Sequence, residues 1–297
     1  MSIYPGVQAG TVEVGAATVR FYDAGVTPDD STPVVLVHGT GGRAETHFFT
    51  LYPMLASRHR VIAIDLSDAN SDTDEETAPL STTGLARQIV ELLDRVVAGQ
   101  KVALVGYSLG AAIAIEVAAS RSETIDSLVL LNGWARTDNE LRLRLALWER
   151  LRDAGDLHSL AEFMTLNVYS RSFLNARSWN DIVQMVASYA VGPGSDRQMA
   201  LNKTLDVSGR LSHVKSRTLV VGSRFDHLIS FSHSLELAGG IQGSVLAELQ
   251  CGHGSVTERP AEVFRLIDQF VRRIESRSEN SSVYEDASLS QLNTFKG

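Results

Sequence analysis

The chain has 297 residues, of which 44% are hydrophobic and 21% are charged, with a formal net charge of −8. This composition is typical of a globular protein with a large core, and the absence of a lysine and arginine cluster argues against nucleic-acid binding. No apolar run approaches the roughly 20 residues that cross a bilayer, and the single cysteine, Cys251, excludes an intramolecular disulfide. Because residues 1–10 show no secretory leader pattern, we expect a cytoplasmic protein without membrane association.

Short apolar runs alternate with helical patterns along most of the chain. Residues 11–14 and 18–22 predict a hairpin around Gly15. Further strands are predicted at residues 33–37, 61–64, 102–105, 127–131, 218–221 and, more weakly, 244–249. Helices are predicted at residues 81–97, 111–119 and 261–274. Strands that alternate with helices in this way predict a doubly wound, mostly parallel α/β sheet.

Residues 134–207 interrupt this alternation. They contain no convincing strand, and their helical patterns are rich in aromatic residues and methionine; Leu141, Leu145 and Trp148 fall on one face of a predicted helix. We interpret the segment as a helical lid inserted into a core formed by residues 1–133 and 208–275. Residues 276–297 are rich in serine, asparagine and acidic residues, so we expect a disordered polar tail.

A candidate nucleophile lies between a predicted strand and a predicted helix. The segment Gly106-Tyr107-Ser108-Leu109-Gly110 follows the apolar run 102–105 directly and precedes the helical run 111–119. A Gly-x-Ser-x-Gly sequence in this position predicts a tight turn that exposes the serine hydroxyl at a helix N-terminus. We therefore predict Ser108 as a catalytic nucleophile.

A serine hydroxyl needs a base, and the base needs an acid that orients it. His253 lies between two glycines after the last predicted strand, and Asp226 follows the strand at 218–221. Both therefore fall in loops at the carboxyl edge of the sheet, where α/β proteins build their sites. Asp138 is an alternative acid, but it comes several residues too late after its strand. The order Ser108, Asp226, His253 indicates a nucleophile, an acid and a base.

The developing oxyanion needs hydrogen-bond donors. We expect one from the backbone N–H of Leu109 and a second from the glycine-rich loop that follows residues 33–37. The second donor is assigned to the N–H of Thr40, with the N–H of Gly41 as an alternative. His38 is expected to support this loop through hydrogen bonds and not to act as a base.

The residues that bind substrate are less distinct in the sequence. Trp134 and Tyr107 lie beside predicted strand ends, and Arg43, Arg136 and Arg224 are candidates for contact with an anionic group. Neither metal-ligand spacing nor a phosphate-binding loop is present, so we predict no cofactor and no metal. The expected partner is a small-molecule substrate; an acyl-carrier or coenzyme A thioester and a homodimer are also compatible with the sequence.

Taken together, these motifs resemble those of the α/β-hydrolase superfamily, in its single-domain form with a helical lid. The resemblance extends over roughly residues 11–275 and rests on Val37-His38-Gly39-Thr40-Gly41, Gly106-Tyr107-Ser108-Leu109-Gly110, Leu219-Val220-Val221-Gly222-Ser223-Arg224-Phe225-Asp226 and Gly252-His253-Gly254. It implies Ser108 as nucleophile, His253 as base, Asp226 as acid and the lid as the element that selects substrate.

Departures from the family pattern argue against some of the activities found in this superfamily. Haloalkane dehalogenases and epoxide hydrolases carry aspartate where this chain has Ser108, and the related carbon–carbon bond hydrolases usually have tryptophan where it has Gly254. Residues 66–71 replace a glycine-rich turn that is common in relatives, and an acidic run, 72–76, follows.

We therefore expect a serine hydrolase that cleaves an ester, thioester or lactone of a mostly apolar small molecule through an acyl-enzyme. The first alternative is a lyase, cyclase or decarboxylating enzyme on the same scaffold, in which the same groups act as an acid–base set. A less favoured alternative is a ligand receptor without catalysis.

Overall fold

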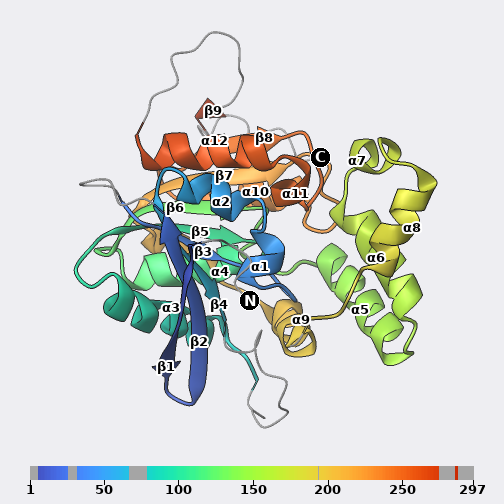
Figure 1. The fold of residues 1–297 in the computed structure, drawn as a ribbon, viewed down its shortest axis with the longest axis horizontal. Coiled ribbons are helices and arrows are strands. Elements are labelled where there is room, and N and C mark those ends of the chain that lie inside the picture. Colours follow the sequence, from blue (N-terminus) through green and yellow to red (C-terminus); the bar gives the residue numbers. More distant parts are fainter. Residues whose placement is uncertain (1–5, 26–31, 67–78, 193, 274–284, 287–297) are drawn as a thin grey trace.

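A mixed sheet runs through the centre of the computed structural model, which describes residues 6–25, 32–66, 79–192, 194–273 and 285–286 (Figure 1). The strand order is β1-β2-β4-β3-β5-β6-β7-β8-β9. The bounds are β1 Gln8–Val14, β2 Ala17–Gly25, β3 Val34–Val37, β4 Arg60–Asp65, β5 Val102–Tyr107, β6 Ile125–Leu131, β7 Arg217–Ser223, β8 Val245–Leu249 and β9 Glu285–Asp286. Strands β3 to β8 pair in parallel, whereas β1, β2 and β9 are antiparallel at the two edges. This is the mostly parallel sheet that the sequence predicts.

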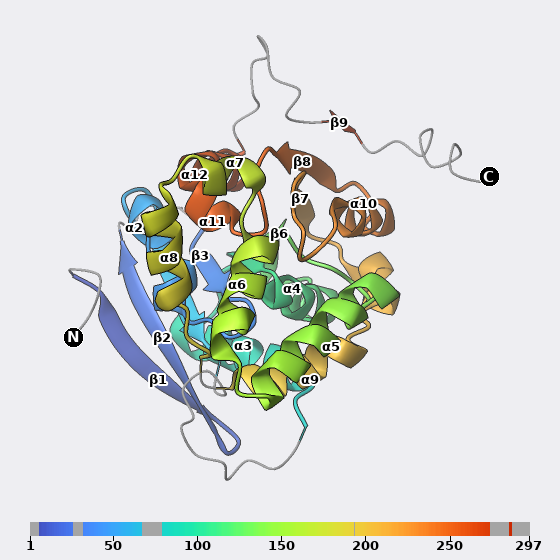
Figure 2. The same cartoon turned by 90° about the vertical axis from the view of Figure 1, so that its right-hand side faces the viewer.

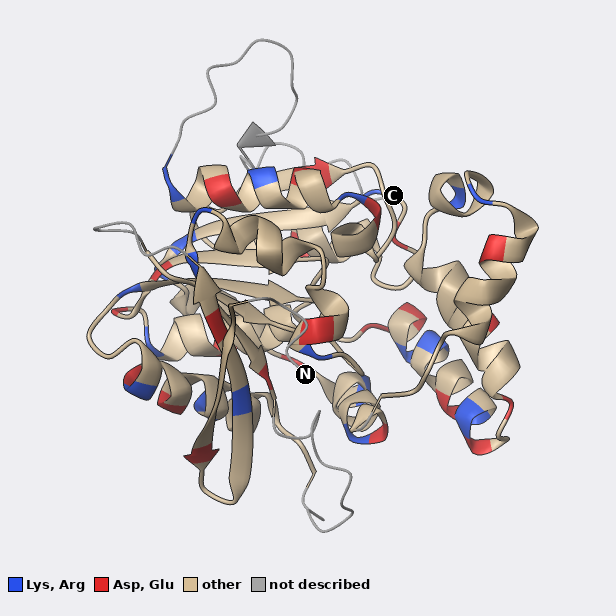
Figure 3. Cartoon of the chain, viewed as in Figure 1, with Lys and Arg blue, Asp and Glu red and all other residues tan. Residues whose placement is uncertain are grey.

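Helices cover both faces of this sheet. Their bounds are α1 Ala44–His47, α2 Leu51–Ala56, α3 Thr82–Val96, α4 Leu109–Ser120, α5 Asn139–Asp153, α6 Leu157–Val168, α7 Arg171–Asn175, α8 Trp179–Ala187, α9 Ser195–Thr204, the 3₁₀ helix η2 Ser208–His213, α10 Phe231–Gly240, α11 Ser255–Glu258 and α12 Pro260–Val271. Helices α3, α4 and α10 contribute to one hydrophobic core, and α2, α11 and α12 contribute to the other. Acidic and basic residues are mixed over the outer helices (Figure 3). The residues buried between the helices and the sheet are mostly apolar.

The predicted strands are all present. The central ones could be predicted because parallel strands that are buried on both faces consist of continuous apolar runs. Every residue of β3 and β5 is buried. The predicted helices are also present, and the Ser81 hydroxyl caps α3 by accepting a hydrogen bond from the Gly84 N–H at 3.0 Å. Among the described residues, each helix is too short or too polar to cross a lipid bilayer.

Helices α5 to α9 make up most of the segment between β6 and β7. Figure 1 shows α5 to α8 as a group beyond the edge at which the parallel strands end, and Figure 2 views this group face on. Leu141, Leu145 and Trp148 form the buried face of α5, as predicted. One antiparallel bridge between Arg136 and Asp206 joins the two ends of the segment.

The expected features at 67–76 and most of the predicted tail, 276–297, lie outside the described residues. Glu285 and Asp286 are the exception, because they pair with Leu246 and Val245 of β8. This pairing covers part of the edge of β8, whose backbone groups would otherwise be unpaired there. The disorder of the tail stays a prediction.

Candidate active site

Ser108 occupies a strained turn between β5 and α4. Its backbone has φ 56° and ψ −120°, a conformation that non-glycine residues rarely adopt. A Cβ on Gly106 would overlap the backbone of Gly110, so the strand and the helix can approach this closely only without a side chain there. The turn places the Ser108 hydroxyl next to the free N–H groups at the start of α4.

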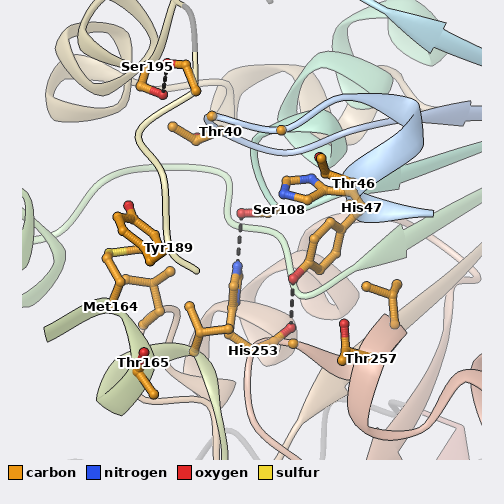
Figure 4. A pocket seen from close by; sticks show the side chains of 18 of the residues that line it. Thr40, Thr46, His47, Ser108, Met164, Thr165, Tyr189, Ser195, His253 and Thr257 are labelled. Atoms are coloured by element: carbon orange, nitrogen blue, oxygen red, sulfur yellow. Dashed lines mark hydrogen bonds between the residues drawn. The ribbon is translucent and has the colours of Figure 1, made fainter. Parts of the chain in front are cut away.

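His253 and Asp226 extend from Ser108 as a hydrogen-bonded series, and Figure 4 shows its first bond, between Ser108 and His253. The His253 Nε2 lies 3.0 Å from the Ser108 Oγ, and the His253 Nδ1 lies 2.7 Å from the Asp226 Oδ2. The other Asp226 oxygen accepts hydrogen bonds from the N–H groups of Leu228 at 2.9 Å and Ile229 at 2.7 Å. Because the carboxylate accepts a hydrogen bond from the Nδ1–H group, the Nε2 lone pair faces the serine hydroxyl.

Asp138, the alternative acid, lies elsewhere. Its side chain caps α5 by accepting from the Leu141 N–H at 2.8 Å, and it lies 3.4 Å from the His233 Nε2. Of the two aspartates, only Asp226 contacts His253.

Two side chains from neighbouring strands hold the His253 loop. The hydroxyl of Tyr107 and the amide of Asn132 both donate to the His253 carbonyl oxygen, at 3.0 and 2.6 Å. Ser223 in turn donates to the Asn132 Oδ1 at 3.0 Å. Burial raises the pKa of Tyr107 well above its usual value, so this hydroxyl keeps its proton. The sequence reasoning missed Asn132, although its position directly after β6 was a usable signal.

The loop after β3, which contains the predicted backbone donor Thr40 and its alternative Gly41, lies beside Ser108. No described residue accepts a hydrogen bond from the N–H of Thr40 or of Leu109, whereas the N–H of Gly41 donates to the Gln198 Oε1 at 2.7 Å. The N–H of the alternative, Gly41, is therefore engaged, and the assignment of Thr40 as the second oxyanion donor stays a prediction. A Cβ on Gly39 would lie 2.8 Å from the Ser108 Cβ, so a side chain there would crowd the serine.

Residues on both sides support this loop. His38 lies 2.8 Å from the Gly39 carbonyl oxygen through Nδ1, and its Nε2 accepts from the Leu66 N–H at 3.2 Å, as expected of a supporting residue. From the other side, the Asn202 amide of α9 donates to the Thr40 Oγ1 at 2.8 Å. Gln198, one turn earlier in α9, is fully buried. The sequence reasoning identified neither α9 residue.

His47 is a further histidine beside Ser108 that the sequence reasoning missed. Its Nδ1 accepts the Gly39 N–H at 3.0 Å, and its ring packs edge-on against Tyr107 with the ring centroids 5.2 Å apart. Burial lowers the pKa of His47 to about 3, with smaller effects from His38 and His253. His47 is therefore neutral at physiological pH.

A cavity of about 680 Å³ adjoins Ser108 and His253. Its wall beyond the sheet is mostly apolar and comes from the inserted helices, through Leu141, Leu145, Trp148, Met164, Met185 and Met199. Such a surface suits a mostly apolar ligand. The described residues include no group of acidic, cysteine and histidine side chains arranged to hold a metal ion.

Only some of the residues that were predicted to contact substrate line the cavity. Trp134, Arg43 and Tyr107 all line the cavity, but the Trp134 Nε1 donates to Thr137 at 2.9 Å and the Tyr107 hydroxyl is engaged by His253. Arg136 and Arg224 are not part of the cavity wall. Arg136 lies on the bridge to Asp206, and Arg224 lies 3.9 Å from Glu248.

Comparison with known proteins identifies the family. The model of the alpha/beta hydrolase family matches residues 34–266. The chain belongs to this family, and it is an enzyme. A pyrrolizixenacetamide deacetylase of Xenorhabdus hominickii is 29% identical over 270 residues, which are 88% of this chain and 97% of the relative.

Solved structures share the fold. A thermophilic esterase of Thermogutta terrifontis superposes with a TM-score of 0.73 at 23% identity, covering 90% of this chain and 98% of the esterase. The enol-lactonase of Burkholderia xenovorans LB400 superposes with a TM-score of 0.75 at 17% identity, covering 89% of this chain and all of the lactonase.

Proposed function

We propose that this enzyme is a serine hydrolase that cleaves an ester, thioester or lactone of a mostly apolar small molecule. The observation that carries the proposal is the hydrogen-bonded series from Asp226 through His253 to Ser108, at the wall of a mostly apolar cavity. This is the arrangement that a serine needs in order to act as a nucleophile.

The proposed reaction begins when the Ser108 hydroxyl gives its proton to the His253 Nε2 and its oxygen attacks the carbonyl carbon. The oxygen of the tetrahedral intermediate accepts hydrogen bonds from the N–H groups of Thr40 and Leu109, close to the positive end of the α4 dipole. The leaving group departs with the proton from His253, and the acyl group stays on Ser108. A water molecule that His253 activates then releases the acid. Asp226 stabilises the imidazolium in both steps.

We also propose that residues 134–207 form a lid that selects the substrate. This segment supplies most of the apolar side chains in the cavity wall, and Arg43 is the predicted contact for a polar or anionic part of the substrate. The acetamide deacetylase among the relatives favours an N-acetyl amide as a further substrate to test.

Replacement of Ser108 by alanine tests the proposal. We expect S108A to lose turnover of p-nitrophenyl esters, alkyl thioesters, lactones and an N-acetyl amide by about 10³-fold or more, because the nucleophile is gone. Ser122→Ala, at an exposed serine, is the matched control and should retain wild-type rates. Equal circular-dichroism spectra would show that S108A folds. Undiminished turnover by S108A would refute the proposal.

A lyase, cyclase or decarboxylating enzyme on this scaffold would use Ser108, His253 and Asp226 without an acyl-enzyme, and a receptor would form no product. Intact-mass spectrometry with a slow ester separates these possibilities. The serine hydrolase gains the mass of the acyl group in the wild type and not in S108A. Product formation without any adduct in a rapid-quench time course favours the acid–base alternative.

A further inference from the structure

His47 is a titratable side chain in the cavity wall that the proposed reaction does not use. Its Nδ1 accepts a hydrogen bond from the Gly39 N–H at 3.0 Å. A neutral imidazole carries one proton, so the proton of His47 is on Nε2. No described residue accepts a hydrogen bond from that Nε2, and the ring is part of the cavity wall. The Nε2–H group is therefore an uncommitted donor.

The ring lies beside the serine. Figure 4 shows His47 and His253 on different sides of Ser108. A Cβ on Gly39 would lie 2.8 Å from the Ser108 Cβ and 3.4 Å from the His47 Cε1, so the serine and the imidazole border the same small space. A Cβ on Gly42 would overlap three atoms of the ring, so the absence of a side chain at Gly42 leaves the space that His47 occupies.

Groups around the ring keep it neutral. The titratable side chains that influence it are His38 and His253, and the ring packs against the Tyr107 ring. No described carboxylate forms an ion pair with His47, unlike the Asp226–His253 pair. A neutral imidazole that donates a hydrogen bond can act as an electrophilic group next to a developing negative charge.

We propose that His47 contacts the substrate and donates a hydrogen bond from Nε2 to an oxygen of the acyl group that Ser108 attacks. This inference rests on the proposed function. It assigns to the site a side-chain donor in addition to the backbone N–H groups of Thr40 and Leu109. It also defines the substrate more closely, as an acyl compound with an oxygen acceptor on the His47 side of the reacting carbon.

Nuclear magnetic resonance on the wild-type protein tests the contact directly. The protein is labelled with ¹⁵N-histidine and treated with a p-nitrophenyl alkylphosphonate. The Ser108 oxygen displaces p-nitrophenolate from phosphorus, which leaves a tetrahedral alkylphosphonyl group with two free oxygens on Ser108. The His47 signals are assigned by their loss in His47→Gln. We expect the His47 Nε2–H proton to move downfield in the adduct, because it gains an oxygen acceptor, while the Nδ1 stays unprotonated. An unchanged Nε2–H signal in a fully labelled adduct would overturn the proposal.

Kinetics of two variants measures what the polar groups of His47 contribute to the rate, and the resonance experiment assigns that contribution to the Nε2–H group. His47→Phe removes both ring nitrogens, and His47→Gln keeps an amide that can both accept from Gly39 and donate. We expect kcat/KM to fall by about 10–100-fold in His47→Phe and by less in His47→Gln, since one hydrogen bond to a developing charge is lost. His158→Phe, at an exposed histidine of α6, is the control and should match the wild type. Wild-type kcat/KM in a folded His47→Phe would refute the proposal.

These experiments distinguish a failure of the proposed serine hydrolase from a failure of the proposed role of His47. If the phosphonate does not label Ser108, or if S108A retains turnover, the proposed serine hydrolase fails. If Ser108 is labelled and the His47 signal does not move, only the role of His47 fails.

Discussion

Two loops border Ser108, one after β8 and one after β3. The first carries His253, and the second leads into α1, which ends at His47; the two histidines differ in their hydrogen bonds. The Nδ1 of His253 donates to Asp226, whereas the Nδ1 of His47 accepts from the Gly39 backbone. The Nε2 of His253 is consequently an acceptor for the serine proton, and the Nε2 of His47 is a donor. The partner at Nδ1 decides what each imidazole can do, and the residue type alone does not.

The two loops also differ in what holds them. The His253 carbonyl is fixed by Tyr107 and Asn132, which belong to the end of β5 and to the position after β6. The Thr40 and Gly41 loop is held by Asn202 and Gln198 of α9, which belongs to the inserted helices. The proposed base therefore depends on the sheet, while the proposed oxyanion donors depend on the insert.

The largest effect is expected from removing the acid that distinguishes His253 from His47. Asp226→Asn keeps the size of the side chain but favours the wrong tautomer of His253, so we expect kcat to fall by about 10³–10⁴-fold. Steady-state kinetics on an activated ester measures this. Asp138→Asn is the matched control, because Asp138 caps α5 and lies away from the site; it should retain nearly full activity. A wild-type kcat in Asp226→Asn would contradict the assignment of the acid.

A smaller effect on kcat is expected from Gln198, the residue of α9 that holds the loop of Thr40 and Gly41. Gln198→Leu removes the acceptor of the Gly41 N–H, so the loop shifts and the Thr40 donor is misplaced. We expect kcat to fall by about 10–100-fold with little change in KM, since the loss acts on the transition state.

The control on the same helix is Lys203→Gln, which breaks only a partly exposed ion pair with Glu149. It should leave both kinetic constants unchanged. A loss in Gln198→Leu that appears only as a lower unfolding temperature, with kcat intact, would show that Gln198 stabilises the fold without positioning the loop.

The contrast between the loops also explains what the sequence could predict. The central strands could be predicted because each is a continuous apolar run. Ser108, Asp226 and His253 could be predicted because each follows such a run, in a loop at one edge of the sheet. Gln198 was not readable, since its contact with Gly41 spans 157 residues of chain and depends on how α9 packs. For His47, the position next to Ser108 follows from the turn through Gly39 and Gly42, and no local pattern marks it.

The pH dependence of stability gives the last and smallest test of this contrast. The pKa of His47 falls from its ordinary 6.5 to about 3 in the folded protein, so the unfolded chain binds more protons between these two pH values. Stability must therefore decrease as pH falls below about 6.5, and it would level off only near pH 3 with respect to this group. Between pH 7 and pH 5 the expected loss of unfolding free energy from His47 is about 1–2 kcal/mol.

Urea unfolding of the wild type and of His47→Gln at several pH values measures this difference. The wild type should lose more stability between pH 7 and pH 5 than His47→Gln does, whereas His158→Gln, at an exposed site, should follow the wild-type curve. Parallel curves for the wild type and His47→Gln would show that His47 titrates like an exposed histidine. In that case burial would not keep His47 neutral at low pH, and the partner at Nδ1 alone would distinguish the two histidines beside Ser108.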